Sequence, residues 1–127
     1  MKKAKTSDAL AIRCARALDE KIGEDILVLD MEGITPIADY MVIATANSQT
    51  HLRALSQAIE EELDKTGKRP NHVEGGADSP WILVDLVDVI VHLFREDSRE
   101  YYDLEHLWGD AKKVVWKTRK PAKKRKK

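Results

Sequence analysis

The chain has 127 residues, of which 43% are apolar and 35% are charged, a composition typical of one globular domain. No apolar run approaches the roughly 20 residues of a membrane-spanning helix, and the single cysteine excludes an internal disulfide. The sequence therefore indicates a small protein with one core in a reducing compartment, and we expect a cytoplasmic location.

The net charge of zero hides an uneven distribution along the chain. Residues 117–127 hold eight basic and no acidic side chains, which leaves residues 1–116 with 14 basic against 22 acidic ones. An acidic body suits a basic protein partner, and a lysine- and arginine-rich tail suits the phosphates of nucleic acid. The composition leaves two alternatives open: the tail serves only as a solvating segment, or the chain is a simple basic-tailed RNA-binding protein.

The first half of the chain predicts a helix, two strands and a second helix. A Thr-Ser-Asp run opens the first helix, apolar residues recur every four positions up to Ile22, and we expect Gly23 to end it in a left-handed conformation. The apolar segments 25–31 and 39–45 are typical of strands covered on both faces. Ser48 caps the second helix, whose apolar stripe ends before residue 66.

The second half predicts three strands and a short final helix, at residues 72–74, 81–85, 88–95 and 98–102. This order predicts an α/β (α+β) fold in which a mixed five-stranded sheet carries two main helices on one face. Because two helices cannot cover both faces, we expect the other face to stay partly open and to present Trp81 and Leu83 together. The expected boundaries are a flexible N-terminus at residues 1–6, the domain at residues 7–110 and a basic disordered tail at residues 111–127.

Carboxylates near the predicted hairpin raise the question of an enzyme. Asp30, Asp85 and Asp88 are the candidates for holding a divalent ion in nucleotidyl or phosphoryl transfer. However, the chain has no Gly-Ser phosphate loop and no Asp-x-Asp pair, and carboxylates at the two ends of a hairpin are typical turn formers. The four histidines lie far apart in sequence, without metal-ligand spacing. We therefore predict no catalytic residue, no metal site and no cofactor.

Aromatic side chains are concentrated in one part of the chain. Five of the seven lie between Trp81 and Trp108. Tryptophan and tyrosine dominate the energetics of many protein interfaces, so the concentration favours a binding protein. The residues alone are equally compatible with Trp81 and Tyr102 completing the core.

An ordered series of motifs carries a family resemblance. The segments are W-I-L-V-D-x-x-D-V-I-V-H-x-F at 81–94 and R-E-Y-Y-D-L-E-x-L-W at 99–108, preceded by D-I-L-V-L-D-M at 25–31, I-A-D-Y-M-V-I-A-T at 37–45 and S-x-x-H at 48–51. In this order and spacing the chain resembles the ribosomal silencing factor family, also called Iojap-like, over residues 7–108.

The resemblance implies a function and a set of contact residues. Family members are expected to share a nucleotidyltransferase-like architecture, to bind the large ribosomal subunit through its ribosomal protein fourteen, and to block the small subunit sterically, repressing translation. Trp81 and Tyr102 match the family's contact positions, with Leu83 and Arg99 as neighbours. An additional rRNA contact is expected from the end of the tail, Lys123, Lys124, Arg125, Lys126 and Lys127. Pairing of two copies away from the ribosome also stays open.

Three residues depart from the family pattern. Val87 stands where a glycine is usual, Ala46 replaces another glycine, and Thr50 replaces an arginine. A hairpin turn at Val87 must then form without a residue that readily takes a positive φ. The chain therefore departs from the family pattern in the segments near residues 46–51 and 85–88.

Overall fold

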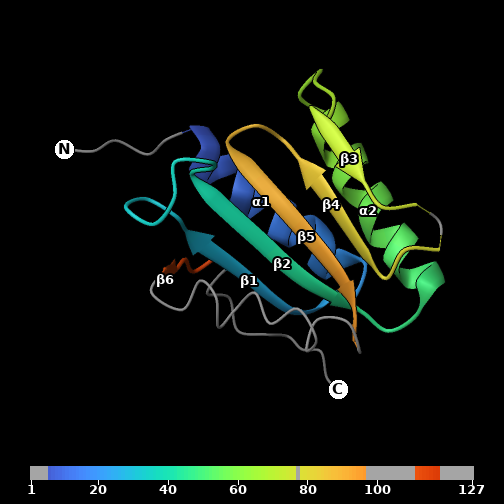
Figure 1. Ribbon diagram of the computed structural model, residues 1–127. Coiled ribbons are helices and arrows are strands. Elements are labelled where there is room, and N and C mark those ends of the chain that lie inside the picture. The colour runs from blue at the N-terminus through green and yellow to red at the C-terminus, as the bar shows by residue number, and fades with distance from the viewer. Residues whose placement is uncertain (1–5, 77, 97–110, 118–127) are drawn as a thin grey trace.

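The computed structural model describes residues 6–76, 78–96 and 111–117. Two helices and six strands occur in these ranges (Figure 1): α1 (Thr6–Glu20), β1 (Glu24–Asp30), β2 (Tyr40–Ala46), α2 (Gln49–Asp64), β3 (His72–Glu74), β4 (Trp81–Asp85), β5 (Val89–Arg95) and β6 (Lys112–Lys113). The short helix predicted at residues 98–102 lies outside the described residues.

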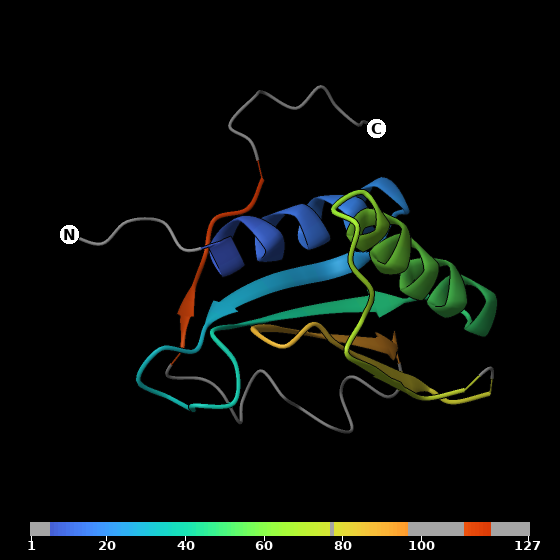
Figure 2. The same cartoon turned by 90° about the horizontal axis from the view of Figure 1, so that it is seen from above.

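The strands form one mixed sheet in the order β3-β4-β5-β2-β1-β6. β2 and β5 pair in parallel at its centre, and every other neighbouring pair is antiparallel. Both helices lie on the same face of this sheet, as Figure 2 shows. The predicted mixed α/β fold with two helices on one face is confirmed, and β6 adds a short edge strand that was not predicted.

The main core lies between the helices and the sheet. The apolar stripe of α2 is buried there as predicted, at Leu52, Leu55, Ile59 and Leu63. An ion pair of 2.8 Å between Arg13 of α1 and Glu62 of α2 joins the two helices along their partly exposed border.

Cys14 of α1 belongs to this core. Its side chain is almost completely buried, and burial raises the pKa of the thiol to about 12, with a smaller contribution from the negative charge of Glu62. A thiol with so high a pKa carries almost no thiolate at neutral pH, so Cys14 serves as a small apolar core residue.

The end of α1 differs from the prediction. The left-handed residue is Ile22, with a φ of 65°, and its side chain is 71% exposed although the periodicity placed it on the buried stripe. Gly23 serves instead to allow a close approach: its N–H donates to the Leu18 carbonyl at 2.8 Å, and a Cβ on Gly23 would lie 3.0 Å from that oxygen. Gly23 is therefore needed because a side chain there would crowd the Leu18 carbonyl, and the left-handed conformation falls on Ile22, one residue earlier.

The start of α2 matches the prediction. Ser48 has an extended conformation, and its hydroxyl oxygen accepts a hydrogen bond from the backbone N–H of His51 at 3.0 Å. This is the geometry of a helix N-cap, so Ser48 has a structural role.

The hairpin between β4 and β5 contains Val87, the residue that stands where the family usually has a glycine. Val87 has a φ of 77°, so the turn does require the left-handed conformation that a glycine would take without strain. A carboxylate oxygen of Asp85 accepts the N–H of Val87 at 2.8 Å, which confirms the predicted turn-forming role of Asp85. The Asp88 carbonyl accepts the N–H of Asp39 at 2.8 Å and so ties the hairpin to the loop after β1.

Residues 111–117 were predicted to begin a disordered tail, but they lie along the edge strand β1. Lys112 and Lys113 of β6 pair with Asp30 and Leu29. Further along, the indole N–H of Trp116 donates to the carbonyl of Ile26 at 3.3 Å. The alternation of apolar residues is too short here to predict a strand, and the pairing depends on contacts remote in sequence.

Candidate docking surface

The face of the sheet away from the helices carries a second apolar cluster. Seven buried residues form it: Leu29, Met31, Ala38, Met41, Ile43, Ile90 and Phe94. Phe94 and Ile43 are fully buried at the centre of this face, so the exposure expected of a partly open face is limited to its rim. Trp81 and Leu83 pack against the rim of this cluster and keep part of their surface exposed.

Trp81 and Leu83 lie on the same face, as their spacing on β4 predicted. Trp81 is opposite Phe94 in the β4–β5 ladder, and its ring stacks on the Phe94 ring at a centroid distance of 5.3 Å. Its indole N–H also donates a hydrogen bond of 3.2 Å to Nδ1 of His92. Trp81 is thus held by two residues of the neighbouring strand.

His92 is the polar group of this cluster. It is hydrogen-bonded to Trp81 and only 5% exposed. Burial lowers the pKa of His92 to about 4, so the ring is neutral at physiological pH. Since Nδ1 accepts the indole N–H, the proton of the neutral ring sits on Nε2, which finds no hydrogen-bond partner within the described part of the chain.

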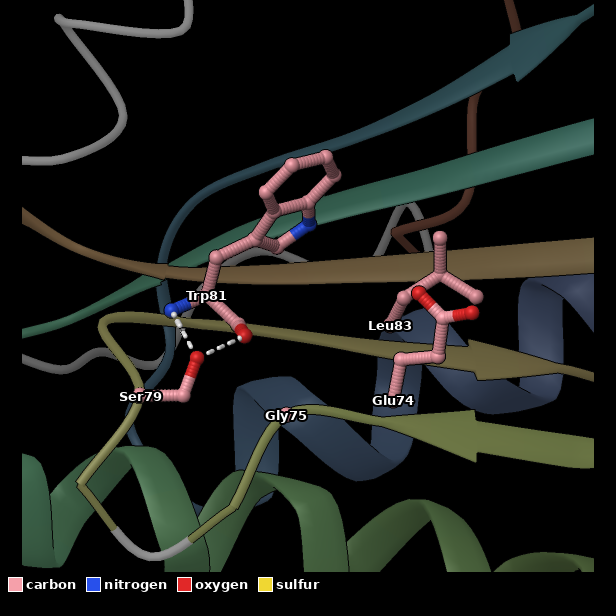
Figure 3. Close-up of a pocket in the computed structure, with 5 residues that line it drawn as sticks. All are labelled: Glu74, Gly75, Ser79, Trp81 and Leu83. Atoms are coloured by element: carbon pink, nitrogen blue, oxygen red, sulfur yellow. Dashed lines mark hydrogen bonds between the residues drawn. The ribbon is translucent and has the colours of Figure 1, made fainter.

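A hollow of about 190 Å³ opens beside Trp81, where the end of β3 meets the start of β4. Figure 3 shows the side chains of Trp81, Leu83 and Glu74 projecting to the same side of these strands. Glu74 is opposite Leu83 in the β3–β4 ladder, and the hollow is completed by Gly75 and Ser79. The surface therefore combines an indole, an aliphatic group and a carboxylate.

The polar side chain at the base of the hollow forms hydrogen bonds with the backbone. The Ser79 hydroxyl donates to the Trp81 carbonyl at 2.7 Å and accepts the Trp81 N–H at 3.3 Å. Gly75 has a φ of 103°, and a Cβ there would lie 2.4 Å from the Trp81 carbonyl oxygen. Both residues fix the start of β4, which leaves Glu74 as the charged group among the described residues that line the hollow.

Of the carboxylates considered for an enzyme, Asp85 and Asp88 flank the same turn, but Asp30 is kept apart from Asp85. β1, which carries Asp30, and β4, which carries Asp85, are separated by β2 and β5. Three interstrand steps place these strands about 14 Å apart, too far for both carboxylates to bind one ion. Within residues 6–76, 78–96 and 111–117, no group of three or more His, Cys, Asp or Glu side chains is arranged to hold a metal.

Several predicted contact residues lie outside the described part of the chain. These are Arg99, Tyr102, Lys123, Lys124, Arg125, Lys126 and Lys127.

Of the other departures from the family pattern, Ala46 is buried at the end of β2 and Thr50 is exposed in the first turn of α2. None of the described helices is long and apolar enough to cross a membrane.

Glu74 is the functional candidate that the sequence did not indicate. No sequence pattern marks Glu74 as a binding residue. It lies beside Trp81 only because β3 pairs with β4.

Comparison with known proteins agrees with this fold. A family model described as "Ribosomal silencing factor during starvation" matches residues 4–127, a longer range than the motifs alone indicated. "Ribosomal silencing factor RsfS" of Bacillus subtilis is 48% identical over 97 residues, covering 76% of this chain and 82% of that protein. The protein of the same name from Halalkalibacterium halodurans is 40% identical over 98 residues, covering 77% and 84%.

A crystal structure of a Chromobacterium violaceum protein superimposes on this chain with a TM-score of 0.77 and 32% identity, covering 89% of this chain and 95% of that one. The fold, the ordered motifs and the extent of these matches agree with one another. The chain therefore belongs to the ribosomal silencing factor family.

Proposed function

We propose that this protein binds the large ribosomal subunit through ribosomal protein fourteen and prevents the small subunit from joining, which represses translation. Membership of the ribosomal silencing factor family supports association with the ribosome. The mechanism is steric: a domain seated on the joining face of the large subunit occupies space that the small subunit needs. No catalytic step is part of this function.

The observation that carries the proposal is the position of Trp81 and Leu83. They are partly exposed and lie two residues apart on the same face of β4, and the Trp81 ring is held by Phe94 and His92. A large aromatic side chain that is fixed before binding loses little conformational entropy on binding, which is a property of hot-spot residues. The acidic body of the chain complements a basic ribosomal protein. Arg99 and Tyr102 remain part of the proposed surface.

The test is sedimentation of the purified protein with separated large and small subunits. We expect the wild-type protein to migrate with large subunits only, and the Trp81→Ala variant to lose this binding. Leu83→Ala, which disturbs the stacked rings less, should weaken binding with little loss of stability. Ile37→Ala is the matched control, because Ile37 is 67% exposed in the loop between β1 and β2, at the opposite end of the sheet.

A joining assay completes the test. Added wild-type protein should reduce the fraction of large subunits that associate with small subunits, and Trp81→Ala should not. Wild-type binding to both subunits, or to neither, would contradict the proposal.

An additional rRNA contact by the tail is proposed on charge alone. Eight basic residues without an acidic one provide a salt-dependent attraction to phosphate. The enzyme alternative has less support, because β1 and β4 keep Asp30 and Asp85 far apart.

A further inference from the structure

We propose that the hollow beside Trp81 receives an arginine side chain of the protein partner, with its guanidinium between the Trp81 indole and the Glu74 carboxylate. This inference rests on the proposed function, since it specifies which group of the partner that surface recognises. It concerns the hollow lined by Glu74, Gly75, Ser79, Trp81 and Leu83.

The walls of the hollow match the two parts of an arginine side chain. Leu83 offers an aliphatic surface for the methylene stem, and the face of an indole is the most favourable aromatic surface for a cation. A guanidinium is planar and stacks on aromatic rings better than an ammonium does, so arginine fits better than lysine. Figure 3 shows Trp81 on one side of this space and Leu83 with Glu74 on the other.

The negative charge of Glu74 also favours an arginine side chain in the hollow. Glu74 has a side chain that is 65% exposed, and one of its carboxylate oxygens lies 2.9 Å from Nε2 of His72. A carboxylate has about four lone-pair sites, so this contact leaves acceptor capacity for a second donor. An exposed carboxylate repels phosphate, which favours a basic protein over rRNA at this position.

The rigidity of the hollow supports recognition of a specific group. Trp81 is stacked on Phe94 and bonded to His92, and its backbone is held on both sides by the Ser79 hydroxyl. Gly75 brings the end of β3 against the Trp81 carbonyl, which fixes the position of the preceding Glu74. The backbone positions of Glu74 and Trp81 are therefore set by the sheet before the partner arrives.

The test compares Glu74→Gln and Glu74→Lys with the wild-type protein, in binding to large ribosomal subunits at several salt concentrations. Because charged partners across an interface attract one another, we expect Glu74→Gln to raise Kd about fivefold or more and to reduce the salt dependence. Glu74→Lys places two cations together and should raise Kd about 30-fold or more. Glu61→Gln is the matched control, since Glu61 is an exposed carboxylate of α2, on the other side of the sheet.

The outcomes separate this inference from the function on which it rests. Loss of binding in Trp81→Ala with unchanged binding in both Glu74 variants would overturn the arginine site and leave the docking surface intact. Unchanged binding in Trp81→Ala would overturn both. An equal effect of Glu74→Gln and Glu61→Gln would mean that only overall charge matters, which would also overturn the arginine site. Thermal unfolding of each variant verifies that the exposed substitutions leave the fold unchanged.

Discussion

The indole N–H of Trp81 donates a hydrogen bond to Nδ1 of His92, 3.2 Å away on the neighbouring strand. The two rings are also stacked, with centroids 5.8 Å apart. The bond requires a histidine whose Nδ1 carries no proton, and burial keeps the ring in that neutral form. The orientation of the proposed docking residue therefore depends on the protonation state of a buried group.

Stability should fall when the solution becomes acidic. The pKa of His92 is about 4 in the folded protein, whereas an ordinary histidine has a pKa of 6.5. As the pH falls through this window, His92 becomes protonated in the unfolded chain but stays neutral in the folded chain. The free energy of unfolding therefore decreases. Each pKa unit corresponds to about 1.4 kcal/mol, which gives a total loss on the order of 3 kcal/mol.

Urea unfolding of the wild-type protein between about pH 7 and pH 4 measures this loss. His92→Gln is the control, because its amide oxygen can accept the Trp81 bond but does not titrate in this window. The same pH dependence in both proteins would exclude His92 as the source.

Val87 should be a site where glycine stabilises the protein. Its β-branched side chain is 59% exposed and its φ is 77°, so it contributes little packing to offset backbone strain. Replacement by glycine removes strain of about 1–2 kcal/mol but increases the entropy of the unfolded chain, for a net gain of about 1 kcal/mol.

Denaturant unfolding of Val87→Gly measures this gain. Val115→Gly serves as the control, because Val115 is 80% exposed and does not have a positive φ. That variant should be unchanged or slightly less stable, and equal gains in both variants would disprove the role of strain.

Ser48→Ala should destabilise α2. The substitution removes the oxygen that accepts the His51 N–H, and loss of an N-cap typically costs about 1 kcal/mol. Ser56→Ala, in the middle of the same helix, replaces serine by a better helix former and should not destabilise. Chemical denaturation of both variants checks the difference, and a smaller loss at Ser48 than at Ser56 would contradict the capping role.

The basic tail should contribute a salt-dependent part of ribosome binding. Deletion of residues 118–127 removes seven of its eight basic residues and retains Trp116, whose N–H bonds to the Ile26 carbonyl. We expect weaker binding to large subunits at low salt and a shallower dependence on salt concentration. Affinity that is unchanged at low salt would disprove the rRNA contact. Replacement of the deleted segment by Gly and Ser residues controls for its length.

The sequence predicted the features that depend only on residues close together in the chain. The stripe of α2, its Ser48 cap and the position of Trp81 beside Leu83 follow from periodicity and capping chemistry, and the structure confirms them. Features that depend on pairing between distant segments were missed. β6 lacks an apolar pattern because two lysines form it, and Glu74 acquires its place only through its register with Leu83.

The errors also have physical causes. Periodicity placed Ile22 on the buried stripe, but the helix ends before that residue and the turn needs the space at Gly23. The partly open face was inferred from the number of helices, which does not predict where on that face the exposed residues lie; central residues such as Phe94 are fully buried.

The pairing of β6 with β1 fixes the point from which the tail extends. Because the Trp116 carbonyl accepts a bond from Arg16 and its indole bonds to Ile26, the chain leaves the domain beside the C-terminal half of α1 and the first half of β1. The ten residues after Lys117 span at most about 35 Å when fully extended. Any phosphate that these ten residues contact must lie within this distance plus the length of a lysine or arginine side chain, which restricts the segments of rRNA that they can touch once the domain is seated.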